Sequence, residues 1–256
     1  MLSDESKGTM KLRHWLAMHK IWSFITICLL GGLALLRYVD MVDLAVASYF
    51  YSEHCRCFPA NDLAGVRWLD QTIRWAGRLA IPILIVWILR YKYLAMLTKS
   101  NEQVYRQKIR ALLFMIVLGM LTPVIFIHEV LKGEIGRARP RHVEQFSGTN
   151  SFTAAWVKSK ACRGDCSFTS GHVAFGAWLM AGWYLGGRQR WLFLSLGAAV
   201  TCLIGWLRMA QGAHFLTDVI GSVLLVWLTA HLLSIAALCG SKYRTNNKET
   251  PQQQRL

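Results

Sequence analysis

Two histidines and one aspartate stand at the ends of long apolar segments in the C-terminal half of the chain. His214 and Asp218 are four residues apart, so on a helix their side chains lie on one face. A carboxylate in that position can accept the proton of one imidazole nitrogen and leave the other as a nucleophile or base. His172 supplies a second acid–base group, so attack and leaving-group protonation can be divided between two residues.

The residues around these histidines suit a phosphoryl group. Arginine offers a planar fork that binds phosphate oxygens in pairs, and lysine supplies a point charge. Where an apolar helix begins, free backbone N–H groups and the positive end of the helix dipole favour an anion, and a glycine allows close approach. The candidate phosphate ligands are Lys132, Arg139, Arg208, Ser170 and Gly171, with Arg137 and Arg141 as candidate contacts to a second phosphate.

Each of these groups also has a structural interpretation. Arg137, Arg139 and Arg141 could form an interfacial patch that contacts lipid headgroups, and this interpretation is favoured for Arg137 and Arg141. His214 and Asp218 could be a polar pair inside a helix bundle, although ionisable residues close to membrane spans are functional candidates by default. The histidines expected to be satisfied or solvated are His14, His19, His54, His128 and His142.

The elements that must position these residues follow from composition. The chain has 256 residues, of which 54% are hydrophobic and 17% charged, and its formal net charge is +15. This is too apolar for an ordinary soluble domain. The basic residues separate apolar runs instead of forming a stripe on a polar background, which disfavours a nucleic-acid partner. The composition therefore predicts a polytopic membrane protein of the all-α class.

Six segments approach the roughly 20 apolar residues that a transmembrane helix needs. They are Ile21–Leu36, Leu79–Leu89 with its apolar flank from Trp75, Ala111–Ile127, Val173–Leu185, Trp191–Leu207 and Val219–Leu238. We expect these six transmembrane helices to form a bundle with the active site at the outer membrane interface. The expected organisation is a cytoplasmic N-terminal tail without a cleavable signal peptide, a membrane domain and a polar cytoplasmic tail, at 1–20, 21–240 and 241–256.

The distribution of lysine and arginine orients this bundle. With the N-terminus inside, sixteen of the 29 basic residues fall on the inner side. The turn Arg90–Arg110 carries six of them and a single acid, Glu102. Because basic loops stay in the cytoplasm, both termini are expected there. All three polar clusters then lie on the outer side of the membrane.

The cysteines agree with this topology. Four of them fall in the expected outer loops: Cys55, Cys57, Cys162 and Cys166. An even number of loop cysteines in an oxidising compartment favours disulfides. Free thiols or a zinc site are the alternatives, and neither spacing is the usual Cys-x2-Cys. The remaining three fall in apolar spans and are expected to be small buried hydrophobes: Cys28, Cys202 and Cys239.

At these residues the chain resembles the type 2 phosphatidic acid phosphatase superfamily. The resemblance rests on Lys132-x6-Arg139-Pro140, Ser170-Gly171-His172 and Arg208-x5-His214-x3-Asp218. Each piece is short, but the three in order, with these spacings and on one side of the membrane, are specific. The resemblance covers Glu129–Val226. Two positions depart from the pattern, Thr169 where the family commonly has Pro and Leu207 where it commonly has Ser, and neither removes a catalytic group.

The resemblance implies a role for each matching residue. His214 is the nucleophile that forms a phosphohistidine, Asp218 orients it, and His172 protonates the leaving group. Lys132, Arg139, Arg208, Ser170 and Gly171 hold the equatorial oxygens, which gain charge in the transition state. Water then hydrolyses the phosphoenzyme. The family needs no metal or other cofactor, and the sequence has no carboxylate cluster that would hold Mg²⁺.

Three further stretches resemble bacterial lipid A phosphatases: Arg137–Arg141, Gln145–Phe152 and Cys166-Ser167-Phe168. This resemblance implies an enzyme of the bacterial inner membrane that dephosphorylates a membrane lipid on the periplasmic side. Lipid A is the expected substrate, with undecaprenyl diphosphate and phosphatidylglycerophosphate as alternatives. Two other functions remain open, a lipid-to-lipid phosphotransferase and a non-catalytic anion-binding transporter or scaffold.

Overall fold

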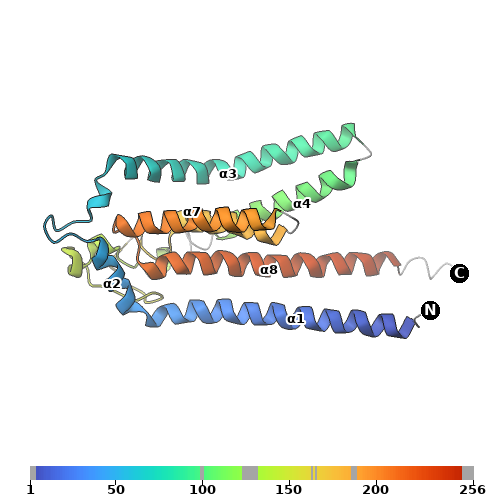
Figure 1. Ribbon diagram of the computed structural model, residues 1–256, viewed down its shortest axis with the longest axis horizontal. Coiled ribbons are helices and arrows are strands. Elements are labelled where there is room, and N and C mark those ends of the chain that lie inside the picture. Colours follow the sequence, from blue (N-terminus) through green and yellow to red (C-terminus); the bar gives the residue numbers. More distant parts are fainter. Residues whose placement is uncertain are drawn as a thin grey trace.

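The protein is built from helices that run side by side, as a computed structural model shows (Figure 1). The structure describes residues 4–98, 101–122, 132–162, 164, 166–185 and 189–249. Within these ranges there are two isolated β-bridges and no β-strand, which confirms the all-α class. α2 and the loops that precede α3 and follow α5 gather at one end of the bundle, called here the loop end. The start of α1 and the end of α8 lie at the opposite end.

Eight α-helices and five 3-10 helices are described. They are α1 (Asp4–Leu35), η1 (Leu36–Tyr38), α2 (Asp40–Phe50), η2 (Pro59–Asn61), α3 (Ala64–Leu97), α4 (Glu102–Gly119), α5 (Lys132–Ile135), η5 (Pro140–His142), η6 (Glu144–Phe146), α6 (Gly171–Met180), η7 (Ala181–Leu185), α7 (Arg190–Ala210) and α8 (Leu216–Glu249).

Four described helical segments are long and apolar enough to cross a membrane. They are Lys20–Tyr38, Ala64–Leu97, Arg190–Ala210 and Leu216–Ala237. They contain the first, second and fifth expected spans and overlap the sixth. The second is much longer than expected, because α3 continues through several arginines before its apolar half. The third and fourth expected spans coincide with α4 and with α6 plus η7. The first turns of α4 are strongly charged, α6 is only 10 residues long, and residues 123–127 lie outside the described ranges.

α6 lies at the centre of the bundle and packs on α3, α4, α7 and α8. Small residues allow its close approach to α7: a Cβ on Gly176 would lie 2.9 Å from the Cα of Thr201. Such small-residue contacts are typical of helix packing in membranes. Beside them, Trp178 of α6 donates a hydrogen bond to the Met115 carbonyl of α4 at 2.8 Å. The helix that begins at Gly171 is therefore held rigidly on several sides.

α1 and α8 form a second contact, on the other flank of the bundle (Figure 1). His231 of α8 is fully buried, and its Nε2 lies 3.0 Å from the Trp22 carbonyl of α1. Nearer the loop end, α2 packs on α7 and α8. Ala47 and Phe58 there join a buried apolar cluster with Phe146 and Phe215. The loop end is thus a packed cap that covers the ends of the long helices.

Four cysteines form disulfides in the loops, as expected. The pairs are Cys55–Cys57 and Cys162–Cys166. The expectation that the membrane cysteines are buried is wrong for Cys28 and Cys202, which are exposed on the outward surfaces of α1 and α7. On a spanning helix that surface faces lipid, so the surroundings remain apolar without protein burial. The side chain of Cys239 lies outside the described part.

Candidate active site

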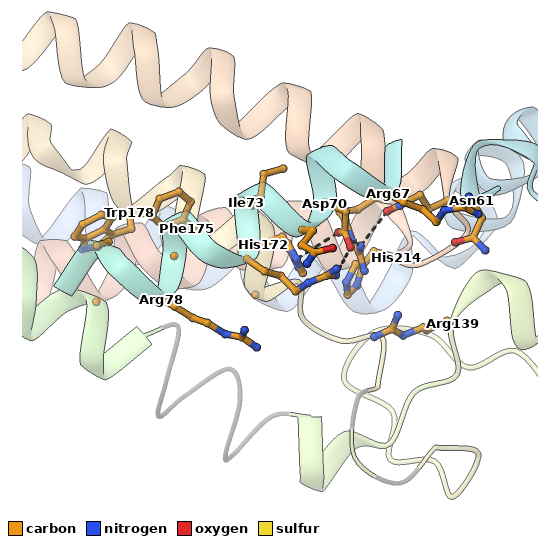
Figure 2. Close-up of a pocket in the computed structure, with 18 of the residues that line it drawn as sticks. Asn61, Arg67, Asp70, Ile73, Arg78, Arg139, His172, Phe175, Trp178 and His214 are labelled. Atoms are coloured by element: carbon orange, nitrogen blue, oxygen red, sulfur yellow. Dashed lines mark hydrogen bonds and ion pairs between the residues drawn. The ribbon is translucent and has the colours of Figure 1, made fainter. Parts of the chain in front are cut away.

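A cavity of about 930 Å³ opens beside α3, between that helix and the ends of α6 and α7 (Figure 2). The three polar clusters of the sequence meet here. The predicted site residues that line it are Arg139, Arg141, Gly171, His172, Arg208 and His214. They come from the loop after α5, the start of α6, the end of α7 and the turn between α7 and α8. These residues share a location because all four segments lie at the same end of the bundle.

The His214 imidazole is held by a main-chain carbonyl. It is 2% exposed, and its Nδ1 lies 2.7 Å from the Ser167 carbonyl oxygen. A carbonyl can only accept, so Nδ1 carries the proton and Nε2 carries the lone pair of the neutral ring. Asp218 lies farther away, with its Oδ2 3.7 Å from Nδ1. The direct orienting partner is therefore Ser167, whereas the sequence indicated Asp218 alone.

Asp218 stabilises this arrangement through its hydrogen bond with Ser167. Its Oδ2 accepts hydrogen bonds from the Ser167 hydroxyl at 2.5 Å and from the Phe215 N–H at 2.7 Å. The Ser167 N–H donates to the Arg137 carbonyl at 2.9 Å. Ser167 is thus bonded through its N–H, hydroxyl and carbonyl, and Asp218 acts on His214 through Ser167 as well as through its charge. Sequence reasoning missed Ser167, because the main-chain contact leaves no residue-type signal.

Burial favours the neutral form of His214. Loss of hydration is the largest cause, and it lowers the pKa of the imidazole to about 3, with the charges of Arg208 and Arg139 acting in the same direction and Asp218 opposing them. A base is free above its pKa, so the ring is unprotonated throughout the neutral pH range. Its Nε2 lone pair is therefore available for attack without prior loss of a proton.

Arg137 corrects an expectation. It is fully buried, and its guanidinium donates to the Asp218 Oδ1 at 2.6 Å, the Asp43 Oδ2 at 2.7 Å, the Thr217 hydroxyl at 2.9 Å and the Thr153 carbonyl at 2.8 Å. A side chain bonded on every edge inside the protein contacts neither lipid headgroups nor a second phosphate. Both interpretations of Arg137 were wrong, and its role is to hold Asp218.

Asp43 is a second residue that sequence reasoning missed. It lies on α2, is fully buried, and accepts hydrogen bonds from the Thr217 N–H at 2.8 Å and the Thr217 hydroxyl at 2.5 Å. These bonds complete a network that joins α2 and the start of α8 to Arg137. From sequence alone, an acid on an amphipathic helix is expected to face solvent. Nothing in the local sequence therefore marks Asp43 as a partner of an arginine 94 positions away.

Arg208, in the last turn of α7, also lines the cavity. It is 6% exposed, and its Nη1 donates to Asp70 of α3 and, at 2.9 Å, to the Gln211 side chain. Its Nε is buried and has no hydrogen-bond partner among the described residues. Asp70 also lies 3.4 Å from the His172 Nε2. α3 therefore brings a carboxylate beside the predicted phosphate ligands, none of which is an acid.

The outcomes for Ser170 and Lys132 differ from those for Arg139 and Gly171, which line the cavity. The Ser170 side chain caps α6 by accepting from the Val173 N–H at 3.5 Å, and it does not line the cavity, so the structure does not support it as a direct phosphate ligand. Gly171 does line the cavity, and nothing lies within 4 Å of the place a Cβ would occupy. The Lys132 side chain lies outside the described part.

The other sequence-level interpretations have simple outcomes. Thr169 and Leu207, the two departures from the family pattern, are buried and do not line the cavity. His54 and His142 are exposed, as expected. The side chains of His14, His19 and His128 fall outside the described residues.

The chain thus combines helices long and apolar enough to cross a membrane with a cavity lined by two histidines and several arginines. Residues 109–238 match the PAP2 superfamily, which is half of the chain, and the protein belongs to that superfamily. It is a phosphatase.

Curated relatives are similar along most of the chain. A "Lipid A 4'-phosphatase" of Francisella tularensis subsp. novicida (strain U112) is 28% identical over 80% of this chain and 90% of its own length. Proteins of the same description from Rhizobium leguminosarum and Rhizobium etli are each 29% identical over 76% of this chain, and over 81% and 74% of their own lengths. No solved structure matches.

The buried ion pairs of Arg137 generate a stability prediction. Removing one partner of a buried pair leaves an uncompensated charge, so Arg137→Met should lower the free energy of unfolding by about 3–5 kcal/mol. The measurement is denaturant titration of the purified protein in detergent, followed by circular dichroism. Lys158→Met is the control, because Lys158 pairs with Glu134 on the surface and should leave stability almost unchanged. Equal effects of the two substitutions would contradict the assignment.

The hydroxyl of Ser167 generates a kinetic prediction. Ser167→Ala removes one donor to Asp218 but keeps the carbonyl that orients His214. Because a hydrogen bond to a charged group contributes about 1.5–3 kcal/mol, we expect kcat for phosphate release to fall by roughly tenfold or more, with little change in KM. Ser195→Ala, on the exposed face of α7, should leave both unchanged. An unaltered kcat in Ser167→Ala would show that this bond does not support His214.

Proposed function

We propose that the protein is a metal-independent lipid phosphatase that forms a phosphohistidine on His214 and removes a phosphate from lipid A. The observation that carries the proposal is the His214 ring, fixed through Nδ1 on the Ser167 carbonyl, in a turn that lines the arginine-rich cavity. That arrangement leaves Nε2 as the free base. A neutral, oriented imidazole beside an anion site is what in-line attack on a phosphoryl group requires.

The proposed reaction has two steps. The Nε2 lone pair of His214 attacks phosphorus, and the bond from phosphorus to the lipid oxygen breaks while His172 protonates that oxygen. Water then attacks the phosphohistidine, His172 takes a proton from the water, and the P–N bond returns its electron pair to His214. Arg139 and Arg208 hold the equatorial oxygens, together with the Gly171 N–H. Lys132 is proposed as a further ligand from the family pattern alone.

The cavity has the character of a lipid site. Phe175 and Trp178 of α6 lie toward one end of the cavity, away from His214 and Arg139 (Figure 2). Ile81 of α3 and Gly119 of α4 also line it. A phosphorylated headgroup can occupy the polar end while acyl chains extend along the apolar end. This division supports a membrane lipid over a soluble phosphate ester.

Arginines along α3 support lipid A among the lipids considered. Arg67, Arg74 and Arg78 all line the cavity, and their spacing of seven and four residues places them in one stripe. At 1.5 Å per residue the stripe is about 16 Å long. One phosphate needs two or three cations, so this row favours a headgroup with a second, separated phosphate, as in lipid A. Arg141 is proposed as a further contact to that headgroup.

The relatives supply the position of attack. Three proteins described as "Lipid A 4'-phosphatase" are similar to this chain over about three quarters of it or more. The 4'-phosphate is therefore the one that we propose to be removed.

The proposed orientation places the cavity in the periplasm. Both disulfides lie in the loop end, which also carries the cavity, and disulfides persist in oxidising compartments. The start of α1 and the end of α8 lie at the other end (Figure 1). We therefore propose an inner-membrane protein with six spans over residues 21–240, in which α4 and α6 complete the bundle, and with cytoplasmic tails at 1–20 and 241–256.

Trapping of the phosphoenzyme tests the proposed chemistry. His214→Ala should abolish phosphate release from lipid A by the purified protein in detergent, and acid-sensitive phosphate label should be recovered on His214 of the wild type only. No described group of three or more His, Cys, Asp or Glu side chains could hold a metal, so EDTA should leave the rate unchanged. Full activity in His214→Ala would contradict the mechanism. Transfer of label to a second lipid instead of water would identify a phosphotransferase.

The α3 arginines generate a specificity prediction with a matched control on the same helix. Arg78 and Arg90 each lie over a tryptophan three positions earlier, Trp75 and Trp87, but only Arg78 lines the cavity. Because a charge-assisted contact contributes about 1.5–3 kcal/mol, Arg78→Gln should raise KM for doubly phosphorylated lipid A by roughly tenfold. KM for a lipid A with the 4'-phosphate alone should change little. Arg90→Gln should alter neither, and an equal effect on both lipids would contradict a second phosphate contact.

A further inference from the structure

Asp70 is a carboxylate in the proposed phosphate-binding cavity. It lies on α3, outside the part of the chain that matches the family, and is 7% exposed. It pairs with Arg208 and with Arg74, and its Oδ1 lies 3.4 Å from the His172 Nε2. Among the described residues that line the cavity it is the only acid. A buried negative charge here opposes phosphate binding, so its presence needs another explanation.

The charges around His172 supply that explanation. Basic groups line its cavity from α3, from the loop after α5 and from the end of α7. The neutral His214, in the turn between α7 and α8, lines the same cavity. These basic groups are Arg67, Arg74, Arg78, Arg139, Arg141 and Arg208. Cations close to an imidazole drive off its second proton. A histidine that must protonate a leaving group needs that proton, and Asp70 is the one described group in the cavity whose charge retains it.

We propose that Asp70 is a positioning residue that keeps His172 protonated and aims Arg208 at the phosphate. This inference rests on the phosphatase mechanism proposed above and adds a residue that the family match does not include. An opposite charge within about 4–6 Å changes a proton equilibrium by roughly 10- to 1,000-fold. Asp70 is within that distance of His172.

Arg208 benefits from the same contact. Asp70 and Gln211 both accept from its Nη1, which fixes the plane of the guanidinium. The Nε remains buried without a partner among the described residues, so one edge of the fork is left for an oxygen of the substrate. An arginine fixed in this way loses little side-chain entropy when phosphate binds.

The proton balance assigns Asp70 no bond to the substrate. As the phosphorus–oxygen bond breaks, its electron pair goes to the lipid oxygen, and the His172 proton goes to the same oxygen. His172 is then neutral, and it regains a proton from the water that hydrolyses the phosphohistidine. Asp70 exchanges no proton in this scheme. It acts only by stabilising the protonated state of His172 at the start of each cycle and by restraining Arg208.

Removing the charge of Asp70 while keeping its shape tests the inference. In Asp70→Asn the amide oxygen can still accept from Arg208, but His172 loses its proton at lower pH. We expect kcat for phosphate release from lipid A to fall about 100-fold at pH 8 and tenfold or less at pH 5.5, so that the basic limb of the pH–rate profile moves to lower pH. Asp62→Asn, the same change at an exposed residue just before α3, should leave the profile unchanged.

Two further measurements separate this role from a structural one. Asp70→Glu restores the charge and should bring kcat at pH 8 to within about tenfold of the wild type. Inorganic phosphate should inhibit Asp70→Asn at least as well as the wild type, because an anion-repelling charge has been removed. Equal loss of kcat at both pH values, no rescue by Glu, or loss of phosphate inhibition would each overturn the inference while the proposed function stands. Failure of the wild type to release phosphate from lipid A would overturn the proposed function and this inference together.

Discussion

The buried guanidinium of Arg137 is the interaction on which the loop end depends. It joins Asp43 of α2, Asp218 of α8 and the chain that follows α5, and all three charged groups are fully buried. Charges removed from water are tolerated only when paired and hydrogen-bonded, so these segments can meet in few ways. The Arg137 carbonyl also accepts from Ser167, which in turn orients His214. A structural arginine thereby sets the direction of the proposed nucleophile.

The site combines residues from the N-terminal and the C-terminal half of the chain. The C-terminal half supplies both histidines, Arg139 and Arg208, on segments that end at one end of the bundle. The N-terminal half supplies Asp70 and the arginine stripe of α3, which face the same cavity from the other side. The family match begins at residue 109, so chemistry common to the superfamily resides in one half. In the proposed scheme, Asp70 of α3 keeps His172 protonated, and the arginines of α3 bind the second phosphate of the headgroup.

Arg137 and Arg139 show why residue type and spacing were insufficient for individual roles. They are two positions apart, share their chemistry, and both lie just before Pro140, yet one is sealed inside the protein and the other lines the cavity. The choice is made by partners far along the chain, Asp43 and Asp218 for Arg137. Ser167 was missed for a related reason, because it acts through its backbone carbonyl. Neither a long-range carboxylate nor a main-chain acceptor can be recognised from local sequence.

The sequence by itself determined the helical class, the lengths of the apolar runs, the order of the three polar clusters and the family they belong to. These properties depend on local composition and spacing, because the thickness of the bilayer sets the length of apolar segment that can span it. Only the tertiary structure decided which arginine is structural, which atom holds His214, and that a carboxylate of α3 stands beside His172 and Arg208. Those outcomes depend on pairing between buried polar groups, and such pairs are chosen by packing across the whole bundle.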